Sequence, residues 1–338
     1  MSEKILNIEP MQFPWRTQDP FLFCAHHRDE YPKGNENHGP AVSLSGRNMG
    51  ADFTIKDGFR MYHGMTVPGF PSHPHRGFET VTITKEGTVD HSDSMGAAGR
   101  FGDGDVQWMT AGKGVQHSEM FPLLHQDQEN TLEIFQIWLN LPAKSKMVEP
   151  YFSMFWHERI PVVAQTVDGA KSELRVIAGA FGDQQALTPA PDSWAADDQH
   201  EVAIWTIKLE PNAKLVLPGA QSAEANRTLY FYQGTGLKIE GREINDYHLV
   251  DVDSTTELTL EGGSSDCYVL LLQGKPLHEP VVQHGPFVMN THEQIHQTML
   301  EYGRTQFGGW PWPKSEQVHD PMRGRFAQHA DGREEIPS

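Results

Sequence analysis

Short segments in which apolar and polar residues alternate run through most of the chain, with glycines and prolines between them. Alternation with period two is typical of strands that have one buried face. In the first half, the segments predicted as strands are 79–84, 88–91, 106–109 and 132–139. The Glu-Gly pair at 86–87 predicts a turn, and therefore a hairpin between the first two of these strands.

The second half of the chain repeats this pattern. The segments predicted as strands are 174–177, 202–209, 214–217, 228–232, 237–239, 257–260 and 267–272. Residues 182–199 are polar and contain prolines, so they are predicted to form a surface loop. Short strands in both halves predict an all-β protein.

The period changes once, near the C-terminal end of the sequence. Thr291 and Gln294 have the spacing of a capping box, and Ile295, Met299 and Tyr302 follow at helical spacing. This segment is predicted to be one amphipathic helix. Residues from about 313 onward are polar and predicted to form a loosely ordered tail.

Length and composition favour two domains of this kind. The chain has 338 residues, with 31 glycines and 23 prolines, which suit many turns between short strands. We expect one domain at 1–160 and a second at 161–338, each a β-sandwich or β-barrel.

Charge and cysteine content restrict the partners and the compartment. With 27 basic and 45 acidic residues, the net charge is −18, and such a surface disfavours nucleic-acid binding. Cys24 and Cys267 are expected to be buried free thiols, which indicates a reducing compartment. No apolar run approaches the length of a membrane span and no secretory leader is evident, so we expect a cytoplasmic protein that does not bind membranes.

Two pairs of residues carry the candidate chemistry. His73 and His75 are separated by one residue, so on a strand both point to the same face, and His117 and Glu119 repeat this spacing. Three imidazoles and one carboxylate suit a divalent transition metal rather than Mg²⁺ or Ca²⁺. Glu79, four residues after His75, is an alternative carboxylate ligand.

The strings HPHRGFETVT, EGTVDHSDSMG and GDVQWMTAGKGVQHSEM resemble the pirin family of the cupin superfamily. The resemblance is specific over residues 65–122. It is looser over about 170–313, where GPFVMNTHEQI and FGGWP also resemble pirin sequences.

The resemblance implies a bicupin, that is, two antiparallel double-stranded β-helix (jelly-roll) barrels. It implies one metal in the N-terminal barrel, Fe²⁺ first, with Ni, Cu, Co, Mn or Zn also compatible with the ligands. The implied ligands are His73, His75, His117 and Glu119, and Glu79 then has a supporting role. Residues 217–234 contain no histidine, so the C-terminal barrel is predicted to be metal-free.

The resemblance also implies two alternative functions. The first is a quercetin 2,3-dioxygenase that acts on a flavonol-like aromatic substrate and O₂, with Glu119 as the catalytic base. The second is a non-enzymatic regulator that binds a protein partner according to the oxidation state of its iron. In a eukaryote, the second function would allow a nuclear location.

One segment departs from the family pattern. The stretch between Phe23 and His73 is longer than its pirin counterpart, and it would cover or narrow the mouth of the metal barrel. Four histidines in this stretch are expected to be surface or core residues rather than ligands: His26, His27, His38 and His63.

Overall fold

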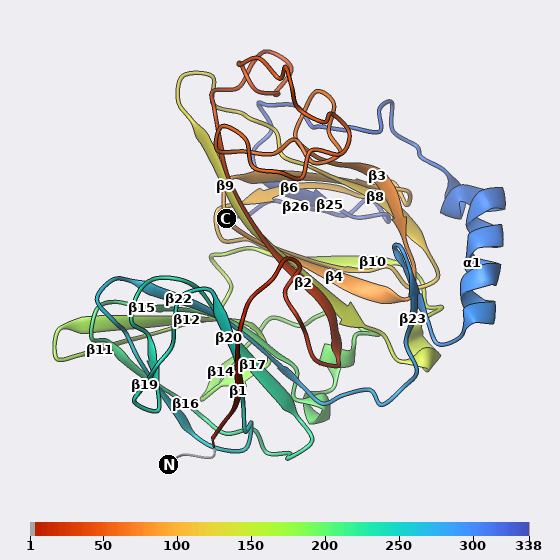
Figure 1. Cartoon of the computed structure of the whole chain (residues 1–338). Coiled ribbons are helices and arrows are strands. Elements are labelled where there is room, and N and C mark those ends of the chain that lie inside the picture. Colours follow the sequence, from red (N-terminus) through yellow and green to blue (C-terminus); the bar gives the residue numbers. More distant parts are fainter. Residues whose placement is uncertain (1–3, 338) are drawn as a thin grey trace. The chain divides into compact units, whose positions relative to one another are not determined.

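The computed structural model describes residues 4–337, which form β-strands and one α-helix, α1 His292–Thr305 (Figure 1). The chain divides into two compact units. Unit 1 contains residues 4–24 and 159–278, and unit 2 contains residues 25–158 and 279–337. The predicted division at 160/161 therefore falls close to one of the observed boundaries.

The two ends of the chain differ from the predicted domains, because each end belongs to the other unit. Strand β1 (Ile5–Pro10) pairs with β20 (His248–Val252) in unit 1. Strand β25 (Phe326–Gln328) pairs with β6 (Ala98–Gly102) in unit 2. Local sequence patterns carry no information about such distant pairings.

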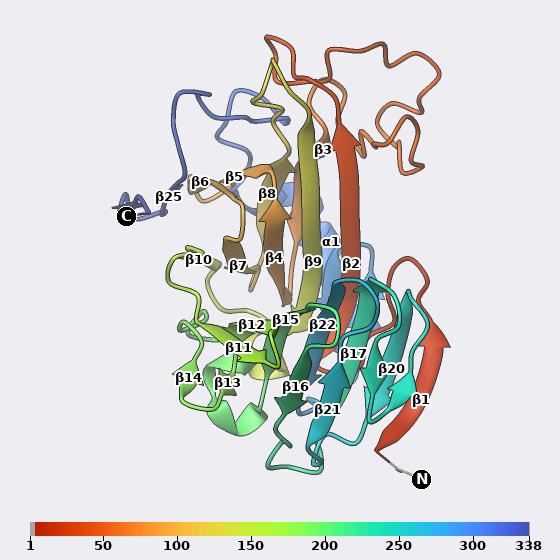
Figure 2. The same cartoon turned by 90° about the vertical axis from the view of Figure 1, so that its left-hand side faces the viewer.

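Unit 2 is built from two sheets with a hydrophobic core between them. The five-stranded sheet, whose strands lie side by side in Figure 2, has the order β10 (Tyr151–Phe155), β7 (Val106–Thr110), β4 (Phe78–Glu86), β9 (Asn130–Asn140), β2 (Phe21–Tyr31). The six-stranded sheet has the order β26 (Glu334–Glu335), β25, β6, β5 (Thr88–Asp93), β8 (Val115–Met120), β3 (Gly69–His75). Val115, Ile134 and Phe152 are buried in the core that these sheets share.

Unit 1 also has two sheets around one core. The larger has the order β1, β20, β17 (Asn226–Gln233), β22 (Cys267–Gly274), β15 (Ala203–Leu209), β12 (Ala170–Ala178), β11 (Val162–Val167). The smaller has the order β16 (Lys214–Leu217), β21 (Leu258–Glu261), β18 (Lys238–Ile239), β19 (Arg242–Glu243). Trp205, Leu229 and Leu260 belong to its core.

The predicted strands are present, but the predicted hairpin at 86–87 is wrong. Strand β4 pairs with β7 and β9, whereas β5 pairs with β6 and β8, so the chain passes from one sheet to the other. Gly87 makes this passage with a φ of +87°. A Cβ there would lie 2.5 Å from the carbonyl oxygen of Thr131, so the position requires glycine.

Residues 182–199 are mainly loop, as predicted, with a few short elements. The two-stranded ribbon of β13 (Ala180–Phe181) and β14 (Gln184–Gln185) begins it. Within residues 4–337, the short 3₁₀ helices are η1 (Ala143–Ser145), η2 (Trp194–Ala196), η3 (Asp198–His200) and η4 (Gln306–Gly308).

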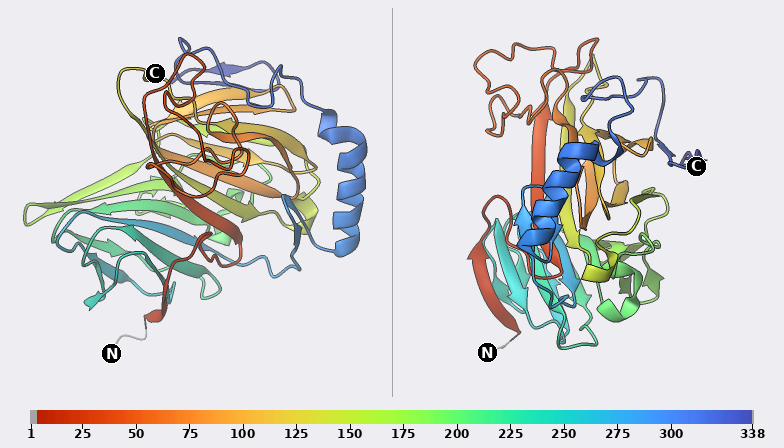
Figure 3. Two further views of the ribbon diagram at one scale, coloured as in Figure 1. Left: turned by 45° about the horizontal axis from the view of Figure 1, so that its top comes forward. Right: turned by 90° about the vertical axis from the view of Figure 1, so that its right-hand side faces the viewer.

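Helix α1 follows the ribbon of β23 (Val282–His284) and β24 (Phe287–Met289) and lies outside the sheets of unit 2 (Figure 3). The capping box is confirmed, since Thr291 and Gln294 hydrogen-bond each other's backbone. The predicted apolar stripe is wrong at Met299, which is 45% exposed. Ile295 and Thr298 are the buried residues of the helix.

The C-terminal segment is not the loose tail that its polarity predicts. Strand β25 extends the six-stranded sheet, and Phe326 is buried. Arg100 pairs with Asp90 and also donates to the backbone carbonyls of His319, Asp320 and Arg323. A buried cation therefore fixes a segment whose own side chains are largely polar.

Cys24 and Cys267 are both free and buried, as predicted. Among residues 4–337, none of the helices has the length and apolar character needed to cross a bilayer.

Candidate metal centre

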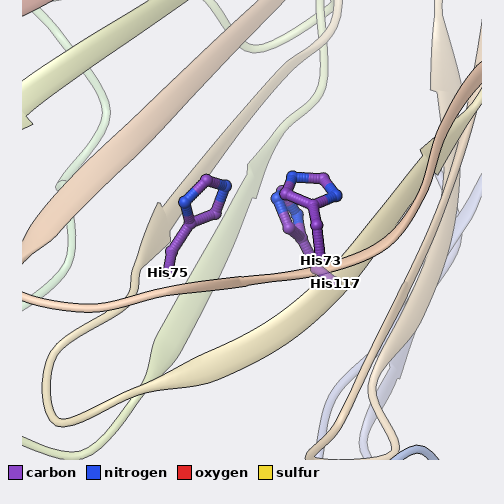
Figure 4. A group of neighbouring side chains, drawn as sticks. All are labelled: His73, His75 and His117. Atoms are coloured by element: carbon purple, nitrogen blue, oxygen red, sulfur yellow. The ribbon is translucent and has the colours of Figure 1, made fainter. Parts of the chain in front are cut away.

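Strands β3 and β8 bring three histidines together, and we call His73, His75 and His117 the histidine cluster (Figure 4). The two strands are antiparallel, with His73 directly opposite His117. The ring centroids are 4.5 Å apart for His73 and His117, 4.8 Å for His73 and His75, and 4.9 Å for His75 and His117. Each ring offers a nitrogen within 4.8 Å of those of the other two rings.

His75 and His117 are buried and His73 is half-buried, and the cluster contains polar atoms that the protein does not satisfy. Nδ1 of His75 and both ring nitrogens of His117 have no hydrogen-bond partner among the described residues. Nδ1 of His73 lies 2.8 Å from the carbonyl oxygen of Pro71, to which it donates, so Nε2 is left as an acceptor. Buried nitrogens without partners are costly, and a metal ion bound by their lone pairs would satisfy them.

The protonation state of the cluster also fits a metal. Burial, together with the neighbouring His63 and His91, lowers the pKa of His73 to about 4, although the hydrogen bond to the carbonyl of Pro71 opposes this shift. Burial likewise lowers the pKa values of His75 and His117, each with a contribution from neighbouring histidines. The rings are therefore neutral at pH 7, which is the form that binds a divalent transition metal.

Glu119 lies beside the cluster but outside the group of closest ligand atoms. Its Oε2 is 3.9 Å from Nε2 of His117. The hydroxyl of Thr82 donates to Oε1 (2.8 Å), and the amide of Gln136 donates to Oε2 (3.0 Å). Burial raises the pKa of Glu119 despite these hydrogen bonds. The hydrogen bonds therefore hold the Glu119 carboxylate next to the histidine cluster.

Glu79 points away from Glu119. Thr82, which contacts Glu119, is three residues after Glu79 on β4, so the two side chains lie on opposite faces of that strand. Glu79 accepts a hydrogen bond from Thr110 (2.7 Å), on the neighbouring strand β7. This geometry favours Glu119 over Glu79 as the fourth ligand.

A fourth histidine adjoins the cluster and was not among the predicted residues. His91 on β5 is paired with Glu119 on β8, and its ring lies 5.5 Å from that of His117. It is fully buried, and its Nε2 lies 3.2 Å from Oδ2 of Asp93. His91 and Asp93 also have the spacing of a histidine and a carboxylate on one strand face, but only the register between β5 and β8 places His91 beside the cluster.

The histidines of the long segment before the cluster have separate environments. His26 hydrogen-bonds Glu133 (3.0 Å), and the ring of His27 packs edge-on against Tyr62. His38 has a left-handed backbone, with φ +62°. His63 is exposed, and its Nδ1 lies 2.6 Å from the carbonyl oxygen of Gly50.

A second group of acidic and histidine side chains, Asp105, His157 and Glu158, lies elsewhere in unit 2. Arg325 already fills it: the guanidinium lies 2.8 Å from Asp105 and 2.9 Å from Nδ1 of His157, and pairs with Glu158. This group is an ion-pair cluster that anchors the C-terminal segment.

Comparison with known proteins gives the family. The family described as Pirin matches residues 12–139, and the Pirin C-terminal cupin domain matches residues 204–308. A Pseudomonas aeruginosa protein named "Putative quercetin 2,3-dioxygenase" is 40% identical over 245 residues, which are 70% of this chain and 79% of that protein. The chain belongs to the pirin family.

Other pirin relatives agree with this assignment. Human pirin is 34% identical over 258 residues, covering 74% of this chain and 81% of that protein. The crystal structure of a quercetin 2,3-dioxygenase from Acinetobacter baumannii superposes with a TM-score of 0.70 at 26% identity, over 90% of this chain and 98% of the other. The predicted family and the all-β bicupin fold are thus confirmed.

Proposed function

We propose that this pirin-family protein is a metal-dependent dioxygenase that cleaves quercetin or a related flavonol. The observation that carries the proposal is the buried histidine cluster, with unpartnered ring nitrogens and the Glu119 carboxylate beside it. The names of the relatives from Pseudomonas aeruginosa and Acinetobacter baumannii support the same reaction.

The three histidines would hold the metal, with Glu119 as the fourth ligand. A bound Fe²⁺, or another divalent transition metal, would supply a Lewis-acidic centre for the 3-oxygen of the flavonol and for O₂. His73 is the half-buried member of the cluster, whereas His75 and His117 are buried, so the substrate approaches past His73.

Glu119 would take the proton of the flavonol 3-hydroxyl at Oε2. Thr82 and Gln136 fix the carboxylate at this position, and the transfer needs only hydrogen-bond reach. In the overall reaction, O₂ adds to the flavonol, two carbon–carbon bonds at C3 break, and C3 leaves as carbon monoxide. Both oxygen atoms from O₂ remain in the depside product.

Apolar rings beside the cluster would exclude water from the bound substrate. Phe78 lies 5.1 Å from the ring of His75, and Trp138 lies 5.5 Å from the same ring. Phe78 and Trp138 also contact each other, with centroids 4.4 Å apart. These rings form an apolar wall on the His75 side of the cluster.

The test is reconstitution of metal-depleted protein, under anaerobic conditions, with Fe²⁺, Ni²⁺, Cu²⁺, Co²⁺ or Mn²⁺ in parallel. After admission of air, we expect the flavonol absorbance of quercetin to decay with at least one of these metals. A His75→Ala variant is expected to bind less metal and to leave quercetin unchanged. Full metal occupancy without quercetin loss for all five metals would refute the proposal.

A further inference from the structure

Three aromatic side chains continue from the accessible side of the histidine cluster to the surface of unit 2. Phe70 lies 6.3 Å from the ring of His73, and His63 lies 5.9 Å from Phe70. Phe53 lies 4.9 Å from His63 and 6.4 Å from Phe70. Phe53 and His63 are exposed and Phe70 is half-buried, so these rings present a solvent-facing aromatic surface.

His63 gives this surface a directed polar atom. Its Nδ1 lies 2.6 Å from the carbonyl oxygen of Gly50, which can only accept, so Nδ1 carries the proton in the neutral ring. Nε2 is then a hydrogen-bond acceptor on an exposed side chain. Phe53 and Phe70 both meet the imidazole edge-to-face, which fixes its orientation.

The segment that carries His63 is held in place by hydrogen bonds. The carboxylate of Glu316 accepts hydrogen bonds from the three consecutive backbone N–H groups of residues 65–67, at 2.6–3.2 Å. Tyr62 has a left-handed backbone with φ +57°, and its hydroxyl donates to the buried Asp29 (2.6 Å). A bulky residue in this conformation is unfavourable and persists only where the surroundings impose it. The surroundings therefore hold His63 in one place.

We propose that Phe53, His63 and Phe70 form a recognition surface for the part of an aromatic substrate remote from the metal, with Nε2 of His63 accepting a hydrogen bond from a phenolic hydroxyl of that part. The inference rests on the proposed function, because it takes the other end of the substrate to be anchored at the histidine cluster. It assigns a role in substrate selection to the long segment before His73.

The experiment measures binding without turnover. Zn²⁺-loaded protein is titrated anaerobically with quercetin and with galangin, a flavonol that lacks the hydroxyls of the distal ring, and tryptophan fluorescence is followed. A His63→Phe variant keeps an aromatic ring and removes the acceptor. We expect it to weaken quercetin binding about tenfold, as for the loss of one hydrogen bond, and to leave galangin binding unchanged.

Two further variants complete the test. His63→Gln, which retains a hydrogen-bonding group, should restore part of the preference for quercetin. His296→Phe, on the exposed face of α1, is the matched control and should bind both flavonols as the wild type does. Metal content should be the same in all four proteins, since none of the changes touches the cluster.

The inference and the proposed function can fail separately. If His63→Phe leaves the ratio of quercetin to galangin affinity unchanged while the wild type still degrades quercetin, the inference is overturned and the proposed function stands. If the ratio falls but no metal supports quercetin loss, the recognition surface stands and the proposed reaction does not. Absence of flavonol binding to the Zn²⁺-loaded wild type would overturn the inference.

Discussion

At the scale of single residues, the buried carboxylates of Glu119 and Glu79 both adjoin strand β4 but have different surroundings. Glu119 shares the interior of unit 2 with the histidine cluster and is held by Thr82 and Gln136. Glu79 projects from the other face of β4 and hydrogen-bonds Thr110. Replacement of each by glutamine keeps the shape of the side chain and removes its charge, so the pair of variants separates a ligand from a structural carboxylate.

Glu119→Gln should reduce metal affinity about 10–100-fold, because it removes an anionic group that binds or orients at the metal. Glu79→Gln should leave metal affinity unchanged, since its carboxylate faces away from the cluster. Competition titration with a chelator, followed by metal analysis, measures both. A larger loss in Glu79→Gln than in Glu119→Gln would show that the choice of carboxylate is wrong.

Much of this candidate site could be predicted from the sequence, because its candidate ligands have local spacing. The pairs His73 with His75 and His117 with Glu119 each alternate on one strand, and the pirin resemblance joined the two pairs. His91 could not be predicted in this way, because it meets the cluster only through the register of β5 with β8. The orientation of His63 depends on the backbone of Gly50 and has no sequence signature.

At the scale of elements, Glu133 joins three neighbouring strands of unit 2. From β9, it accepts hydrogen bonds from His26 (3.0 Å) and Arg28 (3.0 Å) on β2 and from Lys85 (2.6 Å) on β4. Burial alone would raise the pKa of Glu133, but the bond from His26 and the charge of Lys85 outweigh it and lower the pKa to about 2. This carboxylate therefore stabilises the folded form while it is ionised.

The stability from Glu133 should depend on pH. It is fully present above the unfolded pKa of about 4.5 and is lost as the pH falls toward the folded pKa of about 2. Glu133→Gln should lower the free energy of unfolding at pH 7 by about 3 kcal/mol. In this variant, the free energy of unfolding should also decline less steeply between pH 4.5 and pH 2 than in the wild type. Urea unfolding at several pH values measures this.

The control for this prediction is Glu149→Gln, whose carboxylate is 73% exposed and pairs with an exposed lysine. It should change the free energy of unfolding by less than about 0.5 kcal/mol at any pH. If the free energy of unfolding of Glu133→Gln declined between pH 4.5 and pH 2 as steeply as that of the wild type, the assignment of the low pKa to Glu133 would be wrong.

Individual strands could be predicted from the sequence, but their partners could not. Alternation marks 214–217, and the strand β16 occupies these residues. The turn at Gly87 has the local sequence of a hairpin, yet the chain changes sheets there: β4 pairs with β9, and β5 pairs with β8. The polar residues after 313 are ordered by Arg100, which lies more than 200 positions earlier.

At the scale of the whole molecule, each unit combines segments from distant parts of the chain. Residues 4–24 complete unit 1, and residues 279–337 complete unit 2. Among the described residues, the histidine cluster lies in unit 2, and residues 217–234 of unit 1 contain no histidine. We therefore predict a single metal centre in a bicupin chain.

Metal analysis of the purified, reconstituted protein should give one metal ion per chain. His117→Ala should reduce this value to near zero, because it removes a ligand that adjoins both other histidines. A thermal unfolding scan on the same sample should show that the variant remains folded. Two ions per chain, or full occupancy in a folded variant, would contradict a single site at this cluster.

The proposed function requires that a metal held by His73, His75, His117 and Glu119 supports oxygenolytic cleavage of a flavonol. The most direct measurement is the carbon monoxide released when the metal-loaded protein consumes quercetin in air. We predict one carbon monoxide per quercetin consumed by the wild type and none from His75→Ala. Quercetin loss without carbon monoxide, or equal release from the variant, would contradict the claim.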